Sequence, residues 1–372
     1  PVSNEAKWKV PVKENLANID NETMISLLKA MDKSAEENGV FTRMFLFEAH
    51  LYKKYIATSE GTRIDGDIST VRIFQSLLAK GEEGTEQRAG ITASQAGWES
   101  TKTWLSDFEE QYIALSKVAN EPKKTLKSGE TIDFLAGPEI AGIIAHENCG
   151  HPSEGDRIMG REGAQAGESY WRDLELGKSQ VGSSHVNIYD DPTIPESAGY
   201  YLYDDEGVKA RNRVLIKNGI INEPLLNREF GAKFALSSNG AARATDYNRE
   251  PIIRMANTFF SPGEFTFDEL LEDIKKGVYM KSFTEWNIDD RRYQSKYVGQ
   301  ECYLIENGEI TEKMIQRPVL ETTTVSLFSS IDGVSKKLDI DTSAICGKSE
   351  PIQGVPVRCG GGHLRLRNIR LG

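Results

Sequence analysis

Long apolar runs are absent from this 372-residue chain, and so is an excess of positive charge. No stretch approaches the ~18 consecutive apolar residues that a bilayer-spanning helix needs. The formal net charge is −11, and an acidic surface repels phosphate backbones and anionic lipid headgroups. We therefore expect neither nucleic acid nor a membrane as a partner. Arg365 and Arg367 make the closing segment locally basic, but they alternate with leucines, which predicts the solvent face of a strand.

Cysteine and histidine are scarce, with four and five residues respectively. Four cysteines are too few for a secreted disulfide scaffold, and none shows CxxC spacing. Nothing near Pro1 resembles a signal peptide. We therefore expect a reducing, cytoplasmic setting, in which a cysteine is available as a thiolate ligand.

The composition is that of a globular protein, with 38% hydrophobic and 27% charged residues, and the length allows two domains. A polar stretch at residues 121–129 is the best linker candidate. The sequence predicts an α+β fold in which residues 1–125 form a mixed α/β domain. Residues 126–372 would form a strand-rich domain that carries a metal-binding helix.

Periodicity predicts the individual elements within these domains. We expect helices at 21–38, 100–119 and 267–276, strands at 40–50, 51–58 and 68–74, and a glycine-rich loop at 81–97. The aromatic stripe of the second helix is typical of a buried core.

The most informative helix starts after Gly137, because Pro138 suits the first helical position. It leads into His146-Glu147-Asn148-Cys149-Gly150-His151. On a regular helix two metal-binding histidines stand four residues apart, whereas these stand five apart. We expect Gly150 to end the helix as a left-handed cap, and Pro152 to push His151 out of helical geometry. This unwinding would bring His151 back toward His146.

Chance is a weak explanation for this pattern: a His pair at this spacing with an acid after the first is expected about 0.01 times. Two imidazoles and a thiolate suit zinc, and a catalytic zinc site usually has three protein ligands. Cys346 is the favoured third ligand, since it lies in a glycine-containing turn, and Cys359 is nearly as good. His50, His185, His363 and many carboxylates stay open as alternatives.

At this point the chain resembles the TldD/PmbA family of zinc peptidases, on its catalytic, TldD-like side. The resemblance rests on the HExxxH segment at 146–151 with Pro152, and on several ordered stretches further along. These stretches are 190–193, 204–207, 254–258, 346–348 and 355–357. It covers the chain from about residue 130 onward and is vaguer upstream.

The resemblance implies a Zn²⁺ ion held by His146, His151 and Cys346, with Glu147 as the general base. It implies hydrolysis of unfolded or extended peptides inside a dimeric cavity, as a homodimer or as a heterodimer with a metal-free PmbA-like paralogue. Two departures stand out. The segment between Lys348 and Val355 is slightly long, and the chain before the motif is short, so part of the first domain is expected to be missing.

The main alternative is a non-catalytic zinc-containing binding or regulatory subunit. A structural zinc needs a fourth ligand, such as Cys359 or His363, and a metal-free regulatory partner would not need the His pair. Glu147 beside a ligand favours the enzyme. Asn257, Thr258 and residues 204–206 are candidate cleft residues, although turn and cap chemistry explains them equally well.

Overall fold

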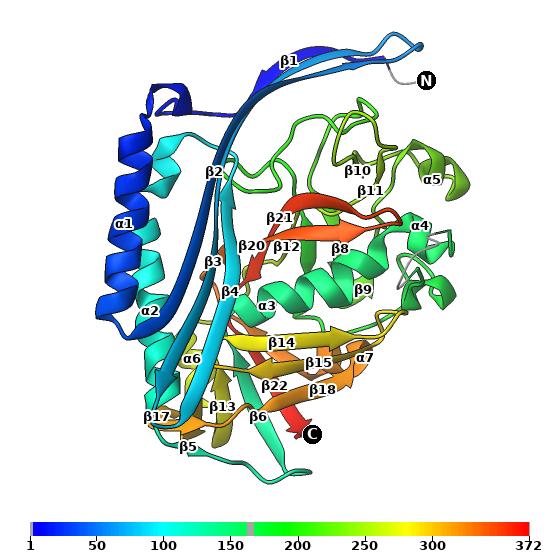
Figure 1. The fold of residues 1–372 in the computed structure, drawn as a ribbon. Helices are drawn as coiled ribbons and strands as arrows, with labels where there is room; N and C mark the ends of the chain where they lie inside the picture. Colours follow the sequence, from blue (N-terminus) through cyan, green and yellow to red (C-terminus); the bar gives the residue numbers. More distant parts are fainter. Residues whose placement is uncertain (1–2, 162–166, 372) are drawn as a thin grey trace.

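The computed structural model describes residues 3–161 and 167–371 (Figure 1). Helices and strands are mixed, with several separate sheets, and the predicted α+β fold is confirmed. The helices are α1 (Asn21–Glu37), α2 (Trp104–Asn120), α3 (Pro138–Ala145), α4 (Gly155–Ile158), α5 (Arg228–Lys233), α6 (Phe267–Glu272) and α7 (Thr324–Ser330). Among the described residues, none of these helices is long and apolar enough to cross a membrane.

The strands are numbered in chain order. They are β1 (Glu5–Lys9), β2 (Val40–Ala57), β3 (Arg63–Gly81), β4 (Gly84–Ser94), β5 (Lys123–Lys124), β6 (Thr131–Ala136), β7 (Ile188–Asp190), β8 (Arg213–Lys217), β9 (Ile220–Ile221), β10 (Ala242–Arg243), β11 (Ile252–Ile253), β12 (Asn257–Phe260), β13 (Lys276–Met280), β14 (Phe283–Ile288), β15 (Gln294–Gly299), β16 (Cys302–Glu306), β17 (Glu309–Ile315), β18 (Val319–Thr323), β19 (Ile331–Val334), β20 (Asp339–Lys348), β21 (Gln353–Gly361) and β22 (Leu364–Arg370).

Helices α1 and α2 cover one face of the long strands β2, β3 and β4 (Figure 1). The predicted aromatic stripe of α2 forms the core here: Trp104, Phe108 and Tyr112 are buried. Phe45 and Phe47 of β2 meet them edge to face. Since side chains alternate along a strand, the residues that alternate with these two, Met44 and Leu46, face away from the helices.

Two element predictions in this region are wrong. The expected pair of strands at 40–50 and 51–58 is one strand of 18 residues, β2, and the predicted turn after it leads into β3. The expected glycine-rich loop at 81–97 contains strand β4. Glycine has low strand propensity, but pairing with β3 along the whole of β4 outweighs it.

A ten-stranded sheet runs through much of the molecule, in the order β1-β3-β4-β20-β21-β12-β7-β8-β9 with β2 paired to β3. It joins strands from both sides of residue 125, so the division into 1–125 and 126–372 stays a prediction about domains. A seven-stranded sheet (β19-β22-β6-β13-β16-β17-β5) and a three-stranded sheet (β14-β15-β18) complete the second part.

Helix α3 lies against β21 and is buried from Ile140 to Ala145. Gly142 permits this packing, because a Cβ atom there would lie 2.8 Å from the backbone nitrogen of Gly360 on β21. The apolar residues around it, which include Ile140 and Ile144, belong to the largest hydrophobic core of the chain. The helix is therefore held rigidly at the point where the motif begins.

Two further expectations need correction. The helix predicted at 267–276 ends at Glu272, and strand β13 begins at Lys276. The predicted strand near the C-terminus exists as β22, but Arg365 is only 5% exposed. Its guanidinium binds Asp332 at 2.8 Å, so a buried ion pair replaces the expected solvent face.

Candidate metal centre

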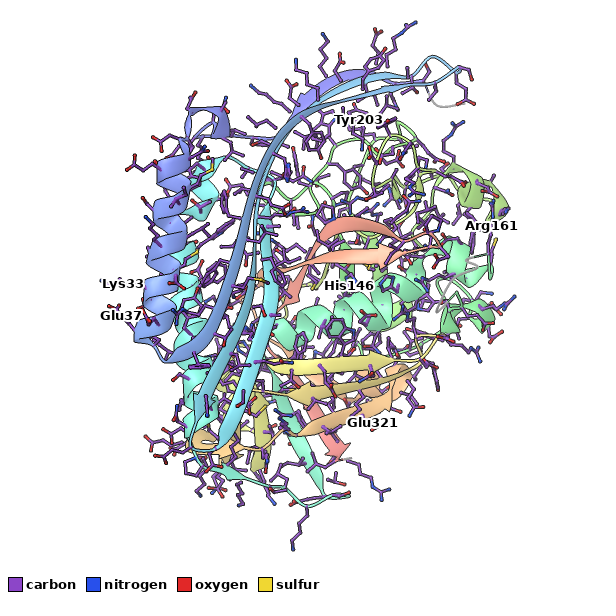
Figure 2. All side chains as sticks on the ribbon, viewed as in Figure 1. Lys33, Glu37, His146, Arg161, Tyr203 and Glu321 are labelled. Carbon is purple, nitrogen blue, oxygen red and sulfur yellow. The ribbon has the colours of Figure 1, made fainter. Side chains whose placement is uncertain are left out.

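Helix α3 continues into a π turn over His146–Gly150. The backbone N–H of His151 donates to the carbonyl of His146, which is the five-residue hydrogen bond of a π helix. This turn brings residues five apart onto one face, as a regular helix does for residues four apart. The two imidazole rings lie 4.9 Å apart between centroids and nearly perpendicular. His146 lies deep in the molecule (Figure 2).

The predicted unwinding at Gly150 is wrong. Gly150 has φ −58° and His151 has φ −59°, both right-handed helical values, and Pro152 follows in a 3₁₀ turn. Gly150 is required for space: a Cβ atom there would lie 1.9 Å from the sulfur of Met255. The π turn supplies the closure of the five-residue spacing that a broken helix was expected to supply.

Cys346 reaches the two histidines from strand β20, in the hairpin that β20 forms with β21. Its Sγ lies 3.3 Å from Nε2 of His151. The donor atoms of His146, His151 and Cys346 all lie within 4.8 Å of one another, and the three side chains are buried. Within residues 3–161 and 167–371, no further His, Cys, Asp or Glu joins this group.

The alternatives that the sequence left open lie elsewhere. Cys359 is buried in β21 outside the group, and burial raises the pKa of its thiol. His363 bonds the Tyr279 hydroxyl at 3.2 Å. His50 and His185 are exposed.

The electrostatics favour a thiolate at Cys346. Burial opposes ionisation, but the adjacent imidazoles of His151 and His146 outweigh it and hold the pKa of the Cys346 thiol well below its usual range. Burial likewise lowers the pKa of His146, and the charge of Cys346 more than compensates, so that the net shift of this pKa is upward. Together the two pKa shifts favour a thiolate at Cys346 between the two imidazoles. A thiolate is the form of cysteine that binds a divalent cation.

A second group of charges lies behind the donor side chains. Glu154 accepts from Nδ1 of His151 at 3.1 Å and from Nε of Arg157 at 2.7 Å, and Nζ of Lys348 lies 3.2 Å from it. Burial raises the pKa of Glu154, yet Lys348, His151 and Arg157 together bring it well below its usual range. A carboxylate behind a histidine fixes the ring so that Nε2 faces the metal.

The donor set fits a divalent metal ion. Nδ1 of His146 is buried and has no hydrogen-bond partner, and such an atom costs free energy unless a ligand satisfies it. Nε2 of His151 and Sγ of Cys346 point toward the same place. Two imidazoles and a thiolate form a three-ligand set that leaves room for an exchangeable fourth ligand.

Glu147 lies beside His146 and is 6% exposed. One carboxylate oxygen accepts from the indole N–H of Trp286 at 3.1 Å, and the other accepts from Arg292 at 2.8 Å. These donors come from β14 and from the turn that follows it. Sequence reasoning missed both, since they are 139 and 145 residues away and carry no motif.

Asn148 was also missed as a functional residue, although it lies inside the motif. Its side chain is fully buried and donates to Ser295 at 3.1 Å and to Thr324 at 2.7 Å. The hydroxyl of Tyr297 donates to its amide oxygen. Asn148 therefore ties the π turn to β15 and α7.

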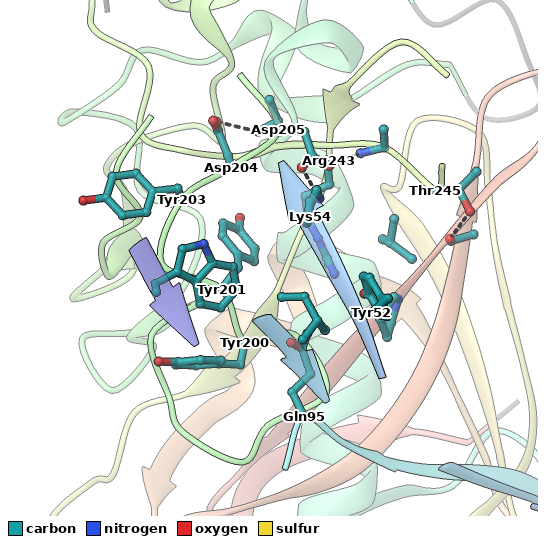
Figure 3. A pocket seen from close by; sticks show the side chains of 17 residues that line it. Tyr52, Lys54, Gln95, Tyr200, Tyr201, Tyr203, Asp204, Asp205, Arg243 and Thr245 are labelled. Carbon is teal, nitrogen blue, oxygen red and sulfur yellow. Dashed lines mark hydrogen bonds and ion pairs between the residues drawn. The ribbon is translucent and has the colours of Figure 1, made fainter. Parts of the chain in front are cut away.

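The expected cleft residues differ in their surroundings. Asn257 and Thr258 are fully buried, and Thr258 donates to Asp190 at 2.8 Å, so both are structural. Asp204 and Asp205 line a cavity of about 120 Å³ beside Tyr201 and Arg243, and none of His146, His151 and Cys346 lines it (Figure 3). Burial raises the pKa of Asp204 to about 7.

Comparison with known proteins identifies the family of the chain. Residues 129–372 match the family model of the PmbA/TldA metallopeptidase C-terminal domain, and residues 14–124 match that of the central domain. The chain is 32% identical to a metalloprotease of Methanocaldococcus jannaschii, over 98% of this chain and 80% of that protein. It is 31% identical to a zinc metalloprotease TldD homolog of Saccharolobus solfataricus, over 87% and 69% respectively.

Solved structures share the fold at low identity. TldE from Thermococcus kodakarensis superimposes with a TM-score of 0.73 at 16% identity, covering 97% of this chain and 76% of that one. A Thermotoga maritima protein gives a TM-score of 0.77 at 17% identity with the same coverage. The family models and the curated relatives carry the assignment: this chain belongs to the TldD/PmbA family of metallopeptidases.

Proposed function

We propose that this protein is a zinc-dependent peptidase that cleaves unfolded or extended peptides, with the ion held by His146, His151 and Cys346. The observation that carries the proposal is the convergence of three buried donors beside an acid. When bound, zinc lowers the pKa of water and polarises a carbonyl group. The name of the Saccharolobus relative supports zinc over other divalent ions.

The chain's own residues supply the proton transfer. Glu147 is the general base: it takes the proton of the attacking water and passes it to the leaving amine. Each carboxylate oxygen accepts one hydrogen bond from Trp286 or Arg292, which leaves a second lone pair on each for this proton. Glu154 keeps His151 oriented during the reaction.

Extended peptides are the proposed substrates because two strand edges lie near the donors. In the part of the chain that the structure describes, β14, which carries Trp286, pairs only with β15. β20, which carries Cys346, pairs with β4 only through Ser343 and Ile91 on its outer edge, among the described residues. A peptide added to such an edge is bound through its backbone and accepts many side chains.

The rival proposal, a non-catalytic subunit that keeps zinc for folding, would need a fourth protein ligand. No fourth His, Cys, Asp or Glu joins the group in the part of the chain that the structure describes. That observation favours the enzyme.

The test is metal analysis and turnover of an unfolded casein-like peptide mixture for the wild type, Glu147→Gln and Cys346→Ala. We expect about one zinc per wild-type chain, with cleavage. Glu147→Gln should keep the zinc and lose turnover by about 10²- to 10⁴-fold, whereas Cys346→Ala should lose the metal. A wild type with bound zinc and no activity would favour the non-catalytic subunit.

We also propose a dimeric partner of the same family, either a second copy or a metal-free relative. The support is the long edge strand β2, on which Phe41, Met44 and Leu46 are more than half exposed. Exposed apolar side chains on an edge strand favour association. Sedimentation of the wild type beside Met44→Lys tests this: a monomer in both would remove the homodimer, leaving the relative to be tested by co-purification.

A further inference from the structure

We propose that Arg292 and Trp286 are positioning residues that hold the carboxylate of Glu147 in its reactive orientation. This inference rests on the proposed function and adds the residues that organise its general base. Both side chains donate to Glu147, one to each oxygen, at 2.8 and 3.1 Å. Two donors on two oxygens fix the carboxylate plane, which a single contact would leave free to rotate.

The turn that carries Arg292 is strained in a way that serves this contact. Arg292 has φ +59°, a left-handed value that a long side chain rarely adopts. The turn is held by Asp289, whose Oδ1 accepts from the backbone N–H of Tyr293 at 2.6 Å and of Gln294 at 3.0 Å. Glycine would satisfy this backbone without strain. An arginine at such a position indicates that its side chain is needed there.

The same turn is bound to the metal-binding segment by a second path. The hydroxyl of Thr324 donates to the carbonyl oxygen of Arg292 at 3.0 Å and accepts from the side chain of Asn148 at 2.7 Å. Asn148 is the direct neighbour of Glu147. The hydroxyl of Thr324 therefore links the hairpin β14–β15 to the π turn. This link fixes the position of the Arg292 guanidinium relative to the Glu147 carboxylate.

Arg291, the adjacent residue, provides a matched control. Its side chain is 50% exposed and binds Asp173 at 2.8 Å, away from Glu147. Both arginines belong to the same turn, so a general disturbance of the hairpin would affect the two variants alike. A positioning role affects only Arg292.

The kinetic test compares Arg292→Gly, Arg292→Lys and Arg291→Ala in the zinc-loaded full chain. We expect Arg292→Gly to lower kcat about 10- to 100-fold with little change in KM. Relief of the backbone strain partly offsets the loss of the ion pair with the buried Glu147. Arg292→Lys should recover part of kcat, and Arg291→Ala should behave as wild type. A kcat for Arg292→Gly within twofold of wild type, or an Arg291→Ala variant that loses as much kcat as Arg292→Gly, overturns the proposal.

A second readout is independent of activity. The chain has five tryptophans, and the loss of one peak in Trp286→Phe identifies the indole N–H resonance of Trp286 in a ¹H–¹⁵N spectrum. The chemical shift of that resonance should change in Glu147→Ala and be unchanged in Arg291→Ala. A resonance that does not respond to Glu147→Ala means that the contact is not formed in solution, and the proposal fails.

The kinetic and spectroscopic tests distinguish a failure of the proposed function from a failure of the positioning role. A wild type that cleaves no peptide with zinc bound rejects the proposed function, and the catalytic role of Arg292 with it, whatever the spectra show. A wild type whose turnover needs Glu147 but tolerates Arg292→Gly keeps the function and rejects the positioning role alone.

Discussion

Glu154 supports the proposed metal centre through its contacts with three charged or metal-binding side chains. It is fully buried and contacts His151, Arg157 and Lys348 at once. Replacing it by glutamine removes the charge that holds the His151 ring and leaves two buried cations less well paired. We expect Glu154→Gln to weaken zinc affinity about 10- to 100-fold, as measured by competition with a chromophoric chelator. Glu175→Gln, which alters an exposed pair with Lys178, should bind zinc as the wild type does. Equal affinity in both variants would refute a supporting role for Glu154.

At the scale of the element, the π turn depends on close packing at Gly150. A methyl group there would overlap the sulfur of Met255, and overpacking of this kind costs about 1–3 kcal/mol. We expect Gly150→Ala to lower the free energy of unfolding by that amount in denaturant titrations. Met255→Ala should recover much of the loss, since the clash is with one flexible side chain. It should not rescue Gly142→Ala, where the overlap is with the backbone of Gly360. Additive effects of Gly150→Ala and Met255→Ala would contradict this packing.

The same element shows how far the sequence could lead. The start of α3 and the pairing of His146 with His151 were predicted, because Pro138 and the motif are local signals. The π turn was not, since backbone geometry is chosen by tertiary contacts such as Met255. The residues alone favoured Cys346 with Cys359 nearly as good, and the family resemblance decided for Cys346. Trp286 and Arg292 could not be found, because only the folded hairpin brings them to Glu147. Helices α1 and α2 followed from periodicity, whereas β4 was hidden by its glycines.

Across the whole molecule, stability should depend on pH through Asp204. Burial raises its pKa to about 7, above the value of about 3.9 for the unfolded chain. Between these values the folded state holds a proton that the unfolded state has lost, so the contribution of Asp204 to stability is full below pH 4 and decreases as the pH rises to 7. We expect the free energy of unfolding of Asp204→Asn to show a flatter slope than that of the wild type over this range. The slope decides the matter, since the substitution also shifts the absolute value. Parallel slopes would mean that Asp204 does not titrate in this window.

The donors of the proposed metal centre are widely separated along the chain, since His151 and Cys346 are 195 positions apart. An ion bound to both acts as a reversible cross-link that closes a long loop, and its binding energy becomes folding energy. Stripping the ion with a chelator should therefore do more than stop catalysis. At a zinc concentration 1,000 times the dissociation constant, the loss is about 4 kcal/mol, visible as a lower melting temperature in calorimetry. Amide hydrogen exchange should become faster first in the hairpin of β20 and β21, which carries Cys346. Equal protection of this hairpin with and without zinc would argue against such a cross-link.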